Sequence, residues 1–217
     1  MRVLPASDRA FLVTFGAAIG ASESRSVRAL HEWLRSDPIP GIVDLHPAYA
    51  SLLVRFDPAA IDSGRLEATL AARAASAPDR PLPAPRSVSI PVRYGGAHGP
   101  DLAEVARVAG LSERAAVEMH AEPLYEVAFL GFSPGFPYLL GLPAALALPR
   151  KATPRKSVPA GSVAIAGRQA GIYPLATAGG WNVIGRTEIA LFDPFREPAC
   201  LLAPGDRVRF VAVEEAR

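Results

Sequence analysis

The sequence offers little cysteine or histidine chemistry. It contains one cysteine, Cys200, and four histidines in 217 residues. A single cysteine excludes an internal disulfide and a cysteine-based zinc cage, and it fits a reducing compartment. His31, His46 and His98 have no metal-like spacing with one another or with a carboxylate. We therefore expect no metal site.

An excess of charge of one sign is also absent, since the formal net charge is only +2. The basic residues are scattered apart from one cluster, and no basic helix or RNA-reading aromatic motif is present, so nucleic-acid binding is not indicated. The chain has no Gly-x-Ser-x-Gly elbow, no phosphate-binding P-loop and no dinucleotide fingerprint. A self-contained serine hydrolase or ATPase is therefore not expected.

Signals for export or membrane insertion are missing too. The start of the chain, MRVLPASDRAFLV, lacks the long apolar stretch and small-residue cleavage site of a signal peptide. Residues 127–149 carry no charge and are long enough to cross a bilayer. However, Pro134, Pro137 and Pro143 interrupt any helix there, and lipid does not tolerate open irregular backbone. We predict buried loops and short strands, in a cytoplasmic protein that has no membrane partner.

The first part of the chain alternates short apolar runs with two amphipathic segments. Helical spacing and composition predict helices at residues 22–36 and 61–75. Short apolar runs predict strands at residues 10–15, 42–45 and 51–56. The order strand, helix, strand, strand, helix matches most of a ferredoxin-like α+β unit.

A proline-rich segment separates this part from the rest. Residues 77–86, APDRPLPAPR, contain four prolines and no periodic apolar face, which indicates a linker. We therefore expect an N-terminal α+β domain at residues 1–80 and a second domain at residues 87–217.

The second domain is predicted to be mainly β structure. A strand is expected at residues 87–92, and Asp101 and Ser112 are each placed to cap a short helix. After Pro123 we expect strands and loops almost to the end, because the chain has 18 glycines and 22 prolines. Alternating basic and apolar residues predict a last strand at residues 207–213.

One cluster of cations lies in the motif PRKATPRK. It contains Arg150, Lys151, Arg155 and Lys156, and Arg168 follows shortly after. Arginine grips a carboxylate or phosphate with a planar fork, and lysine acts as a point charge. The proline-stiffened loop would suit an anionic substrate or intermediate. The alternative is a solvated surface loop or a salt-bridged partner contact.

Glycines and aromatic residues follow this cluster in VPAGSVAIAG, QAGIYP and GGWN. Gly161 permits a close backbone approach, and Tyr173 lies two residues after another glycine. A ligand pocket lined by backbone amides, Tyr173 and Trp181 is one interpretation. The other is that the glycines turn corners in a small barrel whose core Trp181 fills.

His120 and two phenylalanines also leave alternatives open. His120 ends a predicted helix, where it could act as a general acid or base or could complement the helix dipole. Phe132 and Phe136 flank the turn in GFSPGFPY. We expect both to be core residues, and an apolar lip over a pocket or docking surface is the alternative.

Several long motifs, in order, resemble one known family. They are FLGFSPGFPYLLGLP, PRKATPRKSVPAGSVAIAG, QAGIYP, GGWNVIGRT and LFDP, with PVRYGGAHGPDL upstream. The chain is similar to the family of 5-oxoprolinase B subunits, also called allophanate hydrolase subunit 1 or the Kip-type kinase inhibitor family. The resemblance implies an α+β fold: an N-terminal ferredoxin-like α+β domain followed by a C-terminal cyclophilin-like β-barrel of the carboxyltransferase type.

The resemblance also implies partners and a reaction. Members of the family act with a C-type subunit (allophanate hydrolase subunit 2 family) and with an A-type subunit, and the complex uses ATP to convert 5-oxoproline to glutamate. One branch instead inhibits a sensor histidine kinase, and related enzymes hydrolyse allophanate or urea-type amides. ATP is the cofactor of the complex rather than a demonstrated ligand of this chain.

Residue by residue, the motifs also imply a site. Catalytic roles are expected for His120, Arg155 and Lys156. The residues expected to bind substrate are Arg150, Ser157, Gly161, Ser162, Gln169, Tyr173, Trp181 and Asn182. The chain departs from the family pattern at Ala170, where a threonine is usual, and at Ala178, where a proline is usual.

Overall fold

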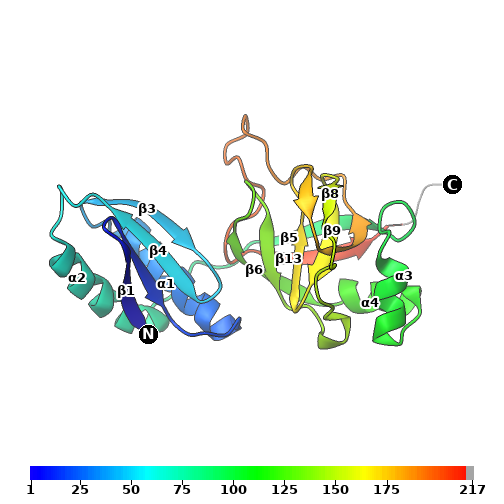
Figure 1. The fold of residues 1–217 in the computed structure, drawn as a ribbon, viewed down its shortest axis with the longest axis horizontal. Helices are drawn as coiled ribbons and strands as arrows, with labels where there is room; N and C mark the ends of the chain where they lie inside the picture. The colour runs from blue at the N-terminus through cyan, green and yellow to red at the C-terminus, as the bar shows by residue number, and fades with distance from the viewer. Residues whose placement is uncertain (214–217) are drawn as a thin grey trace. The chain divides into compact units, whose positions relative to one another are not determined.

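The structure is a computed structural model that describes residues 1–213 of the chain. Two compact units divide it, Met1–Ala84 and Pro85–Arg217, of which the second is described up to residue 213. Figure 1 shows both units as ribbons. In the linker segment, Ala77–Asp79 form a short 3-10 helix, and irregular backbone leads from there to Ser87.

The first unit is a four-stranded antiparallel sheet with two helices. The strands are β1 (Arg2–Ser7), β2 (Ala10–Thr14), β3 (Ile42–Pro47) and β4 (Ser51–Phe56), in the order β1-β2-β4-β3. The helices are α1 (Ala21–Ser36) and α2 (Ser63–Ser76). Alternate residues of β4 are fully buried and pack with the apolar stripes of both helices, which therefore cover one face of the sheet.

One strand of this sheet was not predicted. β1 pairs antiparallel with β2 and occupies the edge position that the final strand fills in a ferredoxin-like unit. Its side chains are almost all exposed, and Pro5 lies within it. An exposed edge strand needs no alternating apolar pattern and tolerates proline, so the usual strand signals are absent.

The second unit is a closed seven-stranded barrel with the strand order β10-β7-β6-β13-β5-β12-β9. Only one pairing, between β5 and β13, is parallel. The strands are β5 (Ser87–Tyr94), β6 (Leu124–Leu130), β7 (Pro137–Leu140), β9 (Ser162–Ala166), β10 (Gln169–Ile172), β12 (Asn182–Arg186) and β13 (Arg207–Ala212). The predicted α+β class with a C-terminal barrel is confirmed.

Further elements lie outside the barrel wall. Helices α3 (Leu102–Ala109) and α4 (Glu113–Ala121) pack against each other (Figure 1). A separate two-stranded ribbon joins β8 (Arg155–Val158) to β11 (Thr177–Gly179). Ser112 caps α4 as predicted, because its hydroxyl accepts a hydrogen bond from the Ala115 amide at 3.2 Å.

Strand β9 is buried on both faces, which reveals two cores in this unit. Successive strand residues point to opposite faces. Val163 and Ile165 join the main barrel core, whereas Ala164 and Ala166 join a second, largely aromatic cluster. The fully buried members of this outer aromatic cluster are Phe136, Val158, Ala164, Ala166, Tyr173, Trp181 and Val183. The cluster therefore lies outside the barrel wall, under the β8–β11 ribbon that supplies Val158.

The uncharged stretch at residues 127–149 forms most of β6, then β7 and the short 3-10 helix Ala144–Leu146, with turns between them. Within the described residues, no helix has the length and apolar character needed to cross a membrane. The predicted short strands are confirmed, whereas the turns between them are only partly buried, since Phe132, Pro134 and Gly141 are exposed.

Candidate functional site

The cationic cluster, here called the basic loop (residues 150–156), is held against the Gly-Gly-Trp turn. The Lys151 amide donates to the Gly180 carbonyl at 2.8 Å, and Arg155 is opposite Gly179 in the β8–β11 ribbon. Asn182 Nδ2 donates to the Pro149 carbonyl at 2.9 Å, just before the loop. Two segments that are separated in the sequence are thus brought into direct contact.

Asp101 is the buried anchor of the basic loop, and the sequence analysis missed this role. Its Oδ1 accepts hydrogen bonds from Lys151 Nζ at 2.7 Å and Arg155 Nη2 at 2.8 Å. Its Oδ2 accepts one from the Val183 amide at 2.7 Å. Asp101 stands at the N-cap position of α3, but its side chain makes no capping hydrogen bond there. Asp101 therefore does not cap α3 with its side chain as expected, and its hydrogen bonds instead connect the start of α3 to β12 and to the basic loop.

The charge state of Asp101 follows from these contacts. Burial raises the pKa of a carboxyl, but the hydrogen bonds from Arg155, Lys151 and the Val183 amide outweigh burial and hold the Asp101 pKa below its usual value. The group is therefore an anion at neutral pH. It compensates part of the positive charge of Lys151 and Arg155.

This pairing divides the four cations of the basic loop into two kinds. Lys151 and Arg155 serve the structure of the loop, with side chains 33% and 28% exposed. Arg150 and Lys156 are exposed. The Arg150 guanidinium carbon lies 6.0 Å from the centre of the Trp181 ring, a cation–π distance. Arg155 is thus tied to Asp101, whereas the side chains of Arg150 and Lys156 are exposed to solvent.

Tyr173 and Trp181 are core residues rather than the walls of an open pocket. They are 1% and 5% exposed and pack edge-on against Phe136 at 5.2 and 5.5 Å between ring centres. Burial raises the pKa of Tyr173, whose oxygen is hydrogen-bonded by the Trp181 backbone. Of the two interpretations left open, the structure favours core packing, with the correction that Trp181 lies outside the barrel wall.

Gly179 is required by this packing. A Cβ atom at Gly179 would lie 2.2 Å from the Tyr173 hydroxyl oxygen, well inside van der Waals contact. The strand β11 can therefore approach the tyrosine only because residue 179 has no side chain.

The two phenylalanines behave differently from each other. Phe136 is 1% exposed, as expected for a core residue. Phe132 is 61% exposed and has a left-handed backbone φ of 67°, so its prediction as a core residue is wrong. Its ring stands edge-on to Phe136 and Tyr173, at 5.5 and 6.3 Å between ring centres. It forms an exposed extension of the outer aromatic cluster.

His120 lies in the main barrel core, so the catalytic role expected for it does not fit its position. Its side chain is fully buried, with the ring against Tyr125 and Phe210. Its Nδ1 is 2.8 Å from the Tyr94 hydroxyl oxygen. Burial lowers the pKa of His120 to about 3, so the imidazole is neutral at physiological pH. A neutral, enclosed ring neither reaches a substrate in this structure nor complements a helix dipole.

The remaining expected site residues are dispersed. Ser157 is exposed on β8, Ser162 is 1% exposed on β9, and Gln169 is half-buried at the start of β10. Asn182 is buried and tethers the basic loop as described. Gly161 is buried and lines a separate cavity. The structure thus places Arg150 and the exposed ring of Phe132 beside the outer aromatic cluster and Lys156 on β8, and it leaves Ser162 and Gln169 without a shared site.

Sequence comparison places this geometry in a known family. The profile of the carboxyltransferase domain, subdomains C and D, matches residues 1–202. A Bacillus subtilis protein named as the B subunit of 5-oxoprolinase is 41% identical over 218 aligned residues, which cover 96% of this chain and 91% of that protein. This chain belongs to the family of 5-oxoprolinase B subunits. An Escherichia coli O157:H7 member of the same name is 59% identical over 133 residues, 61% of each chain.

Solved structures of relatives agree with the fold. TTHA0988 is 46% identical with a TM-score of 0.84, and the alignment covers 96% of this chain but 40% of that one. The protein PH0987 from Pyrococcus horikoshii is 42% identical over 98% of both chains, with a TM-score of 0.59. The K. lactis urea amidolyase is 22% identical with a TM-score of 0.78, and this chain spans 15% of it, so it supports the fold alone. The fold thus occurs both as a chain of this length and within longer chains.

Proposed function

We propose that this chain is the B subunit of an ATP-dependent 5-oxoprolinase complex that converts 5-oxoproline to glutamate. The observation that carries the proposal is the likeness to the Bacillus subtilis protein of that name along almost the whole chain. In this proposal two further proteins, a C-type and an A-type subunit, complete the active site, and the complex consumes the ATP.

The exposed cations of the basic loop support the proposal chemically. Opening the lactam of 5-oxoproline breaks its amide C–N bond and adds water, which yields a carboxylate and an amine. The substrate already carries one carboxylate, and activation by ATP would add a phosphoryl group. Preorganised cations stabilise such anions without reorganisation at the moment of reaction. Arg150 and Lys156 would supply this charge, while Asp101 holds the loop that carries them in place.

The test measures glutamate formed from 5-oxoproline and ATP by the three purified proteins together. We expect the double variant Arg150→Ala and Lys156→Ala to lose at least about tenfold of the activity, because two charge-assisted contacts are removed. Arg209→Ala on β13 is the matched control, since Arg209 is also an exposed arginine of this unit and lies outside the basic loop. Full activity of the double variant would exclude a role for the basic loop in the reaction. Absence of glutamate with the wild-type complex would refute the proposed reaction.

Inhibition of a sensor histidine kinase is a second candidate function, and the exposed Phe132 favours it. A large aromatic ring held out in solvent by a left-handed backbone suits a protein contact. Autophosphorylation of a purified kinase would be measured with and without this chain. Inhibition that Phe132→Ser abolishes would support this function, and unchanged phosphorylation with the wild-type chain would refute it.

A further inference from the structure

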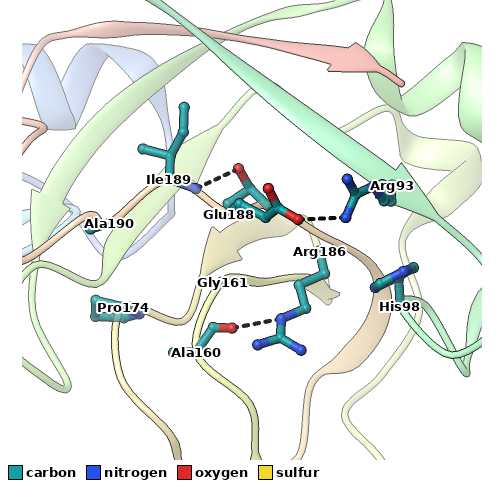
Figure 2. A pocket seen from close by; sticks show the side chains of 10 residues that line it. Arg93, His98, Ala160, Gly161, Pro174, Arg186, Glu188, Ile189 and Ala190 are labelled. Carbon is teal, nitrogen blue, oxygen red and sulfur yellow. Dashed lines mark hydrogen bonds and ion pairs between the residues drawn. The ribbon is translucent and has the colours of Figure 1, made fainter. Parts of the chain in front are cut away.

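A separate cavity of about 450 Å³ opens at the ends of β5 and β12. Its charged lining residues are Arg93, Arg186 and Glu188, with His98 beside them (Figure 2). This volume is in the range of sites for small metabolites. None of the cations of the basic loop lines this cavity.

Arg186, the last residue of β12, is exposed at this cavity and is tethered by one hydrogen bond. Its Nε donates to the Ala160 carbonyl at 3.0 Å. Figure 2 shows the dashed line from Nε to that carbonyl, with the two terminal nitrogens at the end of the side chain. Among residues 1–213, no hydrogen bond or ion pair involves these two nitrogens. One edge of the guanidinium fork is therefore available for a planar pair of ligand oxygens.

The other charges limit what this fork would bind. Arg93 Nη1 and Glu188 Oε1 are 2.5 Å apart, so this arginine and this glutamate largely compensate each other. The cavity then has the single positive charge of Arg186 in excess, beside a carboxylate that repels a second negative charge. A monoanion is favoured over a dianion such as phosphate.

The remaining walls are apolar or tightly built. Pro174 presents apolar surface to the cavity, whereas the Ile189 side chain packs against the main barrel core and only borders it. Gly161 lines it with a φ of 80°, and a Cβ there would lie 2.1 Å from the Thr187 carbonyl oxygen. The Thr187 amide also donates to the Gly161 carbonyl at 2.9 Å, so the two segments are locked together without a side chain between them. The cavity is thus shaped by backbone that only glycine permits.

We propose that this cavity binds a small monocarboxylate, with its carboxylate on the free edge of the Arg186 fork and its apolar body against Pro174. The general inference, a monocarboxylate, depends on this geometry alone. Its specific form, 5-oxoproline, rests on the function proposed above, because 5-oxoproline combines one carboxylate with a compact ring.

Binding to the purified full chain tests the proposal without any enzyme assay. Calorimetry and ligand-observed NMR would compare 5-oxoproline with two partial analogues. Cyclopentanecarboxylate keeps the ring and the carboxylate but lacks the lactam, and 2-pyrrolidinone keeps the lactam but lacks the carboxylate. Inorganic phosphate tests the preference for a monoanion. We expect the two carboxylates to bind, and 2-pyrrolidinone and phosphate to bind at least about tenfold more weakly.

Arg186→Gln is the diagnostic variant, since glutamine can still donate to the Ala160 carbonyl but carries no charge. We expect the affinity for both carboxylates to fall at least about tenfold, with Arg186→Lys intermediate because it keeps the charge but loses the fork. Arg209→Gln serves as the control, because its strand position is opposite Ser89, four residues before Arg93 on β5. Unchanged melting temperatures establish that each variant is folded.

The outcomes separate this proposal from the proposed function. Carboxylate binding that does not respond to Arg186→Gln, or no binding of either carboxylate, overturns the cavity site whatever the complex does. Arg186-dependent binding of cyclopentanecarboxylate without binding of 5-oxoproline supports the cavity site and removes its link to the proposed reaction. Arg186-dependent binding of 5-oxoproline supports both.

Discussion

Replacing Asp101 with asparagine tests whether one buried carboxylate fixes the basic loop. The Asp101 side chain is 5% exposed and accepts hydrogen bonds from Lys151 and Arg155. It also accepts one from the Val183 amide. Asparagine has nearly the same shape but no charge. The substitution therefore removes the ionic part of two contacts without opening a cavity.

The expected loss of stability is set by two opposing effects. Removing one partner of a buried ion pair costs about 3–5 kcal/mol, because the other charge is left uncompensated. Lys151 and Arg155 keep 33% and 28% of their side chains exposed, so water compensates them in part. We therefore expect Asp101→Asn to lower the free energy of unfolding of the second unit by about 2–3 kcal/mol. The melting temperature should fall by about 5–10 °C.

The pH dependence gives this prediction a second readout. Burial raises the Asp101 pKa, but the hydrogen bonds outweigh it, so the folded-state pKa lies below the ordinary value of 3.8. A depressed carboxyl pKa stabilises the protein above the unfolded pKa, and this contribution is lost as pH falls through the folded pKa. The stability difference between wild type and variant should therefore be constant from about pH 5 to 8 and shrink in stronger acid.

Urea unfolding and calorimetry at several pH values would measure these effects. Glu104→Gln is the control, because Glu104 is an exposed carboxylate on the same helix, paired with Arg107. We expect no measurable change for the control, since exposed ion pairs contribute little. If Asp101→Asn destabilises the chain no more than Glu104→Gln does, the carboxylate does not hold the loop and the reasoning is wrong.

Three further predictions follow from the site. Gly179→Ala should lower the free energy of unfolding by about 2 kcal/mol and the melting temperature by about 5 °C, because the alanine Cβ would overlap the Tyr173 hydroxyl. An unchanged melting curve would contradict this. The His120 imidazole should stay neutral from about pH 5 to 8 in an NMR titration, since burial lowers its pKa to about 3. A titration inflection near the ordinary pKa of histidine would show that the ring is open to solvent. Phe132→Gly should leave the free energy of unfolding in urea unchanged or raise it by up to about 1 kcal/mol, because glycine adopts a φ of 67° without strain. A clear loss of unfolding free energy would mean that the Phe132 ring contributes to the core.

The elements that could be predicted have local signals. Strand β4 begins and ends where the apolar run does, at Ser51 and Phe56. Helix α3 begins after Asp101 and ends at Gly110, which takes the left-handed conformation that ends a helix, so its limits have a local signal. The placement of the basic loop beside the Gly-Gly-Trp turn has no such local signal, since strands β8 to β11 lie between the two segments.

The features that could not be predicted depend on contacts between distant residues. Asp101 looks like a helix cap in sequence, and only the fold brings it to cations fifty or more positions further on. His120 has the residue type of an acid or base, but neighbours from β5 and β13 exclude it from solvent. Phe132 and Phe136 are both phenylalanines on either side of one turn. Phe132 has a left-handed backbone angle and is exposed, whereas Phe136 is buried.

The double burial of β9 has a consequence for how this family can change. Strand β9 separates the main barrel core from the outer aromatic cluster. Substitutions in the outer aromatic cluster therefore alter the packing under the basic loop, while the main barrel core keeps its own packing. The five residues of β9 are buried on both faces of the strand, so they are the residues of this unit that tolerate substitution least.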